Sequence, residues 1–268
     1  MNEKLESLPP ISEMMRAAGL EPKKSLGQNF LFDLNITRKI ARSVPGIDDA
    51  SVLEVGPGPG GLTRALLECG AKRVVAIEKD PATKPILDQI VAASDGRLSV
   101  IYGDALKVPT MERGEWSICA NLPYNVGTEL LINWLHRLDK INSLTLMFQK
   151  EVAERIVAKP GTKAYGRLSV LAQLTAAPRI LFNVPNTAFT PPPKVQSAVI
   201  QLMPRPAAVL PTGLETLTAR LFGQRRKMIR AILPDIDWSQ FNLTGTERAE
   251  QLSPEKFAEI AIAVPDLR

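Results

Sequence analysis

Between residues 51 and 149 the chain alternates short runs of Val, Ile and Leu with longer amphipathic stretches. The apolar runs predict strands at residues 52–55, 73–77, 98–102, 116–120 and 143–148, and the stretches between them predict helices. Strands that alternate with helices form a parallel sheet with right-handed crossovers, and the helices cover both of its faces. We therefore expect an α/β fold with a doubly wound, mostly parallel sheet.

Segments on either side of this region extend the prediction. Helices are expected near 35–44, 150–158 and 167–177, and strands at 180–184 and 195–203 would form an antiparallel pair that closes one sheet edge. Residues 203–206 resemble a linker, and helical patterns follow at 213–222, 224–233 and 253–262. We predict two domains, a ligand-binding domain over 1–204 with an N-terminal extension over 1–22, and a small α-helical domain over 205–268.

Composition excludes several classes of protein. No apolar stretch reaches the ~20 residues that span a bilayer, and the first residues resemble neither a signal peptide nor a transit peptide, so we expect a cytoplasmic protein. Cys69 and Cys119 have no metal-ligand spacing and are predicted to be buried and reduced. The single histidine, His136, has no acid or cysteine partner by spacing, which argues against His-dependent chemistry. A net charge of +5 fits an anionic partner but decides little alone.

A glycine-rich loop follows the first strand of the predicted sheet. Gly56, Gly58 and Gly60 allow a tight turn that brings the backbone close to a ligand, at the start of a helix whose amides can contact it. The spacing also satisfies G-x-G-x-x-G, so a site for NAD stays open as an alternative. Glu78, at the end of the second strand, suits the ribose hydroxyls of either NAD or S-adenosylmethionine.

The next two strands end in residues suited to an adenine amine. Asp104 follows the third strand and can accept a hydrogen bond from such an amine. Asn121-Leu122-Pro123-Tyr124 follows the fourth strand: the Asn121 side-chain oxygen and the Leu122 carbonyl can each accept one N6 hydrogen, while Tyr124 can stack on the base. The alternatives are a simple strand-to-loop turn for the tetrapeptide and helix N-caps for the two acids.

Five motifs in this order resemble those of the ribosomal RNA adenine N6,N6-dimethyltransferases, and especially their bacterial small-subunit (16S) members. The motifs are residues 23–31, the glycine loop with Glu78, Asp104, the tetrapeptide 121–124, and residues 189–195. The related erythromycin-resistance methylases of large-subunit RNA more often carry Ile after the Asn and usually lack so close a match to residues 224–227. The resemblance runs from about residue 20 to the C-terminus.

The resemblance implies roles for individual residues in binding S-adenosylmethionine. Asn29 and Leu31 would line the cofactor pocket, Gly56 and Gly58 would contact the cofactor, and Glu78 would hold its ribose. Asp104 would hold the cofactor adenine, and Asn121 would face both cofactor and target base. No metal is expected.

Two further predictions concern RNA. Phe189 precedes three prolines that stiffen the chain, so its ring can form the second wall of a base-stacking slot opposite Tyr124; the alternative is a core phenylalanine. Arg225, Arg226 and Lys227, together with Arg230, would place cations on successive helical turns, suited to RNA phosphates, although a solvated face is the commoner meaning of such a run.

These expectations combine into a class I, Rossmann-like methyltransferase that uses S-adenosylmethionine. The resemblance implies that it converts two adjacent adenosines near the 3′ end of small-subunit ribosomal RNA to N6,N6-dimethyladenosine, within a pre-ribosomal 30S particle and as a monomer. The alternatives are methylation of adenine in large-subunit RNA or DNA, and a ribosome-assembly or nucleic-acid-binding factor whose methylation is dispensable.

Overall fold

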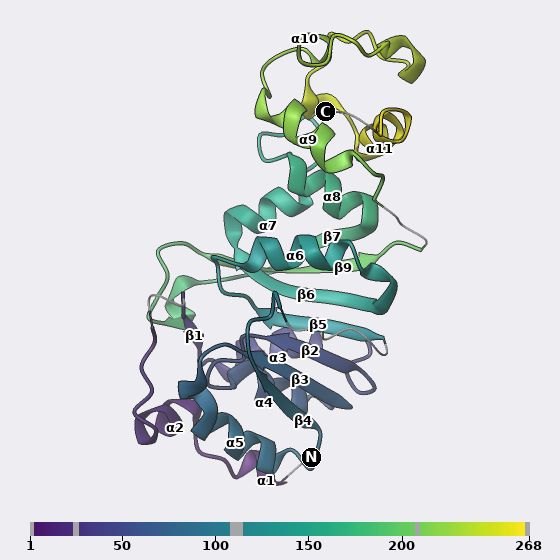
Figure 1. The fold of residues 1–268 in the computed structure, drawn as a ribbon. Helices are drawn as coiled ribbons and strands as arrows, with labels where there is room; N and C mark the ends of the chain where they lie inside the picture. The colour runs from purple at the N-terminus through teal and green to yellow at the C-terminus, as the bar shows by residue number, and fades with distance from the viewer. Residues whose placement is uncertain (1–2, 24–26, 108–114, 207–209, 266–268) are drawn as a thin grey trace.

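The protein is built around one twisted sheet with an α-helical region at one end (Figure 1). The computed structural model describes residues 3–23, 27–107, 115–206 and 210–265. The strand order across the sheet is β4-β3-β2-β5-β6-β9-β7. The bounds are β2 Ser51–Val55, β3 Arg73–Glu78, β4 Leu98–Tyr102, β5 Trp116–Asn121, β6 Ile141–Gln149, β7 Ala176–Val184 and β9 Ser197–Pro204.

The pairing of these strands confirms the predicted α/β class. From β4 to β6, neighbours in the sheet run parallel, whereas β9 lies antiparallel between β6 and β7. The antiparallel pair expected at one edge is therefore present, with β7 as the edge strand. A separate two-stranded ribbon pairs β1, Phe30–Leu31, with β8, Phe189–Thr190.

Helices cover both faces of the sheet because successive residues of each strand point to opposite sides. Leu53 and Ile118 face a core shared with α6 Gly127–Leu135, α7 Lys150–Val157 and α8 Arg167–Thr175. Val52 and Cys119 face the other core, shared with α3 Leu34–Arg42, α4 Gly61–Glu68 and α5 Lys84–Ala93. Short 3₁₀ helices lie at Pro81–Thr83, Leu138–Lys140 and Asn186–Ala188.

The N-terminal extension packs onto the domain that follows it. Its helices are α1 Glu3–Glu6 and α2 Ile11–Ala17, and Leu5 and Met14 are buried in the core around α4 and α5. The buried guanidinium of Arg64 donates to the carbonyls of Pro9, at 2.7 Å, and Leu5, at 3.1 Å. Residues 3–20 thus belong to the packing of the large domain.

The C-terminal region continues the apolar core around α8. It comprises α9 Leu214–Gly223, α10 Ile229–Ile232 and α11 Pro254–Ala263, with 3₁₀ helices at Trp238–Phe241 and Ala249–Gln251. Phe222 stacks on Phe257 with ring centroids 5.4 Å apart, and Tyr165 meets the edge of Phe222 at 5.9 Å. The predicted boundary near residue 204 separates two regions in sequence, but the side chains of both share one core.

The helix predicted over 224–233 is wrong. Residues 224–227 form a turn and a bend, Met228 makes an antiparallel bridge with Arg248, and only Ile229–Ile232 is α-helical. The amides of Ile229 and Arg230 donate to the carbonyls of Glu247, at 2.8 Å, and Gly245, at 3.0 Å. These amides are bonded outside the helix, so residues 225–227 do not occupy successive helical turns.

Other expectations from composition have mixed outcomes. Both cysteines are free thiols, and Cys119 is buried as predicted, but Cys69 is partly exposed at the end of α4. His136 caps α6, and its Nε2 lies 2.7 Å from Glu215 Oε1 in α9. Within the residues that the structure describes, no helix is long and apolar enough to cross a membrane.

Candidate active site

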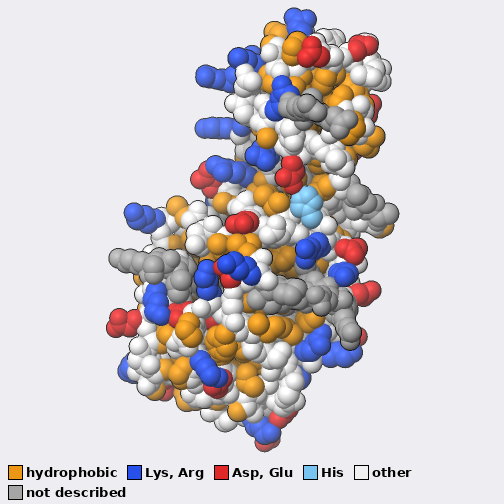
Figure 2. Space-filling view, viewed as in Figure 1, with side chains coloured by type: hydrophobic (Ala, Val, Ile, Leu, Met, Phe, Trp, Pro, Cys, Tyr) orange, Lys and Arg blue, Asp and Glu red, His pale blue; other side chains and the backbone are white. Residues whose placement is uncertain are grey.

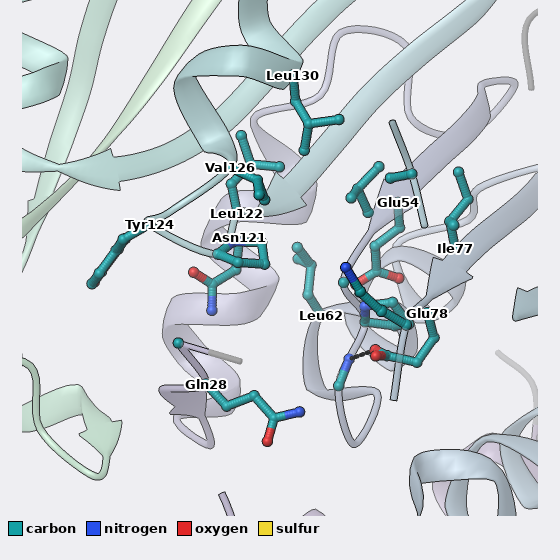
Figure 3. A pocket seen from close by; sticks show the side chains of 18 of the residues that line it. Gln28, Glu54, Leu62, Ile77, Glu78, Asn121, Leu122, Tyr124, Val126 and Leu130 are labelled. Atoms are coloured by element: carbon teal, nitrogen blue, oxygen red, sulfur yellow. Dashed lines mark hydrogen bonds between the residues drawn. The ribbon is translucent and has the colours of Figure 1, made fainter. Parts of the chain in front are cut away.

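A pocket opens at the carboxyl ends of β2, β3, β4 and β5, the edge where α/β sheets bind ligands (Figure 3). It is closed on another side by residues 27–31, which precede α3. The pocket brings together nine residues that the sequence singles out: Asn29, Leu31, Gly56, Gly58, Glu78, Asp104, Asn121, Leu122 and Tyr124. These residues come from five separate parts of the chain, and their predicted roles in ligand binding stay predictions.

The glycine loop wraps over the end of β2. Gly56, Gly58 and Gly60 have φ values of 71°, 55° and 88°, in the left-handed region that other residues rarely adopt. A Cβ on Gly61 would lie 2.7 Å from the carbonyl oxygen of Leu31, so α4 can start this close to β1 only with glycine there. The loop therefore presents bare backbone to the pocket.

Glu78 joins the glycine loop to the end of β3. Its Oε2 accepts from the Gly58 amide at 2.9 Å (Figure 3), and its Oε1 accepts from the Asp80 amide at 2.6 Å. Burial raises the pKa of this carboxyl, against the lowering effect of the two amides. Each oxygen keeps a lone pair for a further donor, such as a ribose hydroxyl.

Asp80 is a functional candidate that the sequence analysis missed. Its side chain is buried and accepts from Lys23 Nζ at 2.8 Å and Gln28 Nε2 at 3.1 Å. Burial alone would raise the pKa of Asp80, but the hydrogen bonds from Lys23, Ala82 and Gln28 outweigh it and hold the pKa below its usual value. The carboxylate therefore ties the segment before β1 to the end of β3.

Asp104 lies at the rim of the pocket, after β4. Its Oδ2 lies 3.0 Å from Lys79 Nζ, and its Oδ1 accepts from the Leu106 amide at 3.1 Å. The hydrogen bond from Lys79 is the main reason that the pKa of Asp104 is lowered. The group is thus an ionised acceptor, as binding an adenine amine requires.

Asn121, the last residue of β5, has a defined orientation. Its Nδ2 donates to the carbonyl of Asn29 at 3.4 Å, so its Oδ1 points elsewhere, towards the side of the pocket on which Tyr124 lies (Figure 3). The amides of Val126 and Gly127 donate to the carbonyl of Pro123, which leaves the Leu122 carbonyl outside the bonds that start α6. Two oxygen acceptors thus follow one another at the end of β5.

Tyr124 forms part of the pocket wall and is anchored through its hydroxyl. The phenol oxygen lies 2.8 Å from the Ser197 Oγ at the start of β9. Burial raises the pKa of Tyr124, so the phenol stays neutral at physiological pH.

Phe189 does not contribute to the pocket wall. Its ring is 3 % exposed and packs in the core around β1, where Phe189 pairs with Leu31. The structure thus corresponds to the alternative, a core phenylalanine, because the side chain is buried among the apolar side chains of that core. A role as second wall of a stacking slot requires this ring to become accessible and stays a prediction.

The basic run lies far from the pocket, in the C-terminal region. Figure 2 shows Lys and Arg side chains along one edge of that region. Arg226 and Lys227 are exposed, whereas Arg225 pairs with Glu250 and donates to the carbonyls of Lys163, at 2.6 Å, and Thr162, at 2.9 Å. The guanidinium of Arg225 is therefore occupied in joining the turn 224–228 to the loop before α8.

Comparison with known proteins is consistent with this geometry. The family model described as ribosomal RNA adenine dimethylase matches residues 19–265. Ribosomal RNA small subunit methyltransferase A of Rhodospirillum rubrum is 50 % identical over 97 % of this chain and 93 % of that protein. The protein of the same name from Ruegeria pomeroyi is 52 % identical over 96 % of this chain and 97 % of that protein.

Among solved structures, a dimethyladenosine transferase from Plasmodium falciparum has a TM-score of 0.76 and 25 % identity, and the match covers 88 % of this chain and 97 % of that one. The family model and the two bacterial relatives each span nearly the whole chain, including the sheet edge and the C-terminal helices. This chain belongs to the ribosomal RNA adenine dimethylase family.

Proposed function

We propose that this protein transfers methyl groups from S-adenosylmethionine to N6 of two adjacent adenosines near the 3′ end of small-subunit ribosomal RNA, which gives N6,N6-dimethyladenosine. The observation that carries the proposal is the orientation of Asn121, whose amide nitrogen is bonded to Asn29 while its oxygen points to the Tyr124 side of the pocket (Figure 3). The names of the two bacterial relatives support the small-subunit substrate over the large-subunit alternative.

The pocket fits S-adenosylmethionine by the chemistry of its donor and acceptor groups. Bare backbone at Gly56 and Gly58 leaves room for a ligand close to the chain, and the buried carboxylate of Glu78 can accept from ribose hydroxyls. Asp104 can accept from the adenine amine. When bound, the cofactor supplies a methyl group on a sulfonium, which is a charged leaving group.

The residues after β5 address the weakness of the nucleophile. The lone pair of an aromatic amine is delocalised into the ring, so the reacting nitrogen must become pyramidal. The Asn121 side-chain oxygen and the Leu122 carbonyl can accept hydrogen bonds from the two N6 hydrogens, and these bonds would stabilise the pyramidal nitrogen. Tyr124 offers a ring on which the flipped base can stack.

The second transfer makes a further demand on the same residues. A monomethylated amine has one hydrogen left, and its first methyl group must turn away from the cofactor before N6 can react again. One of the two acceptors is then sufficient, and the pocket must leave room for a methyl group beside Asn121.

The RNA contact would be made mainly by the C-terminal region. Arg226 and Lys227 are exposed cations that can neutralise phosphates. We further propose that the substrate is a pre-ribosomal 30S particle and that the protein acts as a monomer in the cytoplasm, where such a particle would be assembled.

Nucleoside mass spectrometry tests the proposal. Small-subunit particles that lack the modification are incubated with the protein and isotope-labelled S-adenosylmethionine, and large-subunit particles serve as the control. We expect two labelled dimethyladenosines per small-subunit particle. Label in large-subunit RNA alone, or no label in either particle, would contradict the proposal.

A further inference from the structure

The side chain of Ser197, a buried residue of the sheet, forms a hydrogen bond with the hydroxyl of Tyr124. The two oxygens lie 2.8 Å apart, and Ser197 is 0 % exposed. Ser197 is the first residue of β9, where it pairs with Gln149 of β6 on one side and Val184 of β7 on the other. Strands on both sides fix its backbone, so the residue that bonds the Tyr124 hydroxyl has a fixed place in the sheet.

Tyr124 lies in the turn between β5 and α6, and its backbone alone leaves the ring free to rotate about two side-chain torsions. A hydrogen bond at the far end of the ring restrains the first torsion, because rotation about it would carry the hydroxyl away from Ser197. Stacking on a base depends on the plane of the ring, because offset or tilted rings share less contact area. The bond to Ser197 therefore sets the position of the ring beside the pocket, and with it the offset between the ring and a stacked base.

The same segment also supports the cofactor side of the pocket. Seven residues before Ser197, Thr190 pairs with Phe30 of β1, next to Asn29, whose carbonyl orients the Asn121 amide. The segment from 189 to 197 thus contacts β1 at one end and Tyr124 at the other. One stretch of chain, residues 189–197, therefore contacts both the β1 side and the Tyr124 side of the pocket.

We infer that Ser197 is a positioning residue for methyl transfer: its buried hydroxyl holds the far end of the Tyr124 ring, and so keeps the ring where the target adenine stacks. The inference rests on the proposed function. Ser197 is not among the residues that line the pocket, so it would act only through the Tyr124 hydroxyl.

A double-mutant cycle tests this inference. The single-turnover rate of transfer to unmodified small-subunit particles, at saturating cofactor, is measured for Ser197→Ala, Tyr124→Phe and the double variant. We expect each single variant to be roughly 3- to 10-fold slower, the range expected for loss of one neutral hydrogen bond. The double variant should be no more than about 2-fold slower than either single variant, because each change removes the same bond.

The matched control is Ser143→Ala. Ser143 is also a buried serine in the sheet, and its Oγ donates to the Ser117 Oγ at 3.2 Å, near the amino ends of β5 and β6 and away from the pocket. Its loss should leave the transfer rate unchanged. The affinity for S-adenosylmethionine should be the same in all variants.

The outcomes separate the inference from the function on which it rests. Wild-type protein that makes no dimethyladenosine would contradict the proposed function itself. With an active wild type, effects of Ser197→Ala and Tyr124→Phe that multiply in the double variant would show that Ser197 acts through general packing, and the inference would be wrong. If Ser197→Ala does not fold, Tyr124→Phe still decides: a wild-type rate overturns the inference, and a 3- to 10-fold loss supports it.

Discussion

Replacing Asn121 by Ala should separate chemistry from binding at this site. The substitution removes one of the two acceptors proposed for N6, the side-chain oxygen, which the Nδ2 bond to Asn29 holds in place. Removing one preorganised transition-state hydrogen bond costs about 2.7–4 kcal/mol, which corresponds to a rate loss on the order of 10²–10³. The bond to Asn29 is long, at 3.4 Å, so its loss should lower stability by only about 0.5 kcal/mol, the low end for a hydrogen bond.

Single-turnover assays that resolve mono- from dimethyladenosine would measure this effect. Affinities for S-adenosylmethionine and RNA, from calorimetry, should stay close to those of the wild type. Asn121→Asp is a matched variant of the same shape that keeps an acceptor but loses the donor to the Asn29 carbonyl. We expect it to be slow as well, because a carboxylate oxygen and that carbonyl repel each other. Near-wild-type transfer by Asn121→Ala, or a rate loss explained by weaker cofactor binding, would refute the acceptor mechanism.

Three further predictions follow from particular contacts. Replacing Arg226 and Lys227 by Ala should lower the slope of the log–log plot of RNA affinity against salt concentration by about 1.4–1.8, with no loss of stability. Arg225→Ala should instead lower the free energy of unfolding by about 1–3 kcal/mol, measured by urea denaturation. An unchanged salt slope would mean that Arg226 and Lys227 are solvated and do not contact RNA. Glu78→Ala should weaken S-adenosylmethionine binding by about 1.5–3 kcal/mol in calorimetry, and binding of NAD in place of S-adenosylmethionine would falsify the assignment of the pocket. Burial raises the pKa of Glu54 to about 8, so this carboxyl ionises at lower pH in the unfolded chain than in the folded one, and the free energy of unfolding of the wild type falls as pH rises from about 4.5 to about 8. Glu54→Gln should lack this loss, which is about 2 kcal/mol between pH 6 and pH 8. If the free energy of unfolding of the two proteins changes equally with pH, Glu54 is not buried as a neutral acid.

The sequence predicts the sheet edge well because the chemistry there is local to strand ends. Glu78 and Asn121 each end an apolar run that is recognisable by itself, so their meeting at one edge follows from the parallel order of the strands. Asp80 is different. It resembles an N-cap for the short helix at Pro81–Thr83, and it does accept from the Ala82 amide, but its other partners, Lys23 and Gln28, lie more than fifty residues away.

At the basic run, by contrast, the local sequence pattern predicts a helix much longer than the one that the structure contains. Residues 224–233 have helix-forming composition, but the amides of Ile229 and Arg230 bond to the chain around residues 245–247. Only the folded C-terminal region offers those carbonyls. The same long-range contacts direct Arg225 to Glu250 and leave Arg226 and Lys227 exposed, a division that no pattern within the run contains.

Three hydrogen bonds that support the pocket join residues distant in sequence: Gln28 with Asp80, Asn29 with Asn121, and Tyr124 with Ser197, separated by 52, 92 and 73 positions. Bonds of this span form only after the sheet has assembled, so the Asn121 amide and the Tyr124 hydroxyl are held in place before any ligand binds. An aromatic amine is a weak nucleophile, and positioning it against a charged leaving group is the main task left to the protein. Orientation set in advance needs no reorganisation during transfer. Loss of the Asn29–Asn121 or Tyr124–Ser197 bond should therefore slow transfer more than it weakens binding, whereas loss of the Gln28–Asp80 bond, which holds a segment of the pocket wall, should weaken cofactor affinity first.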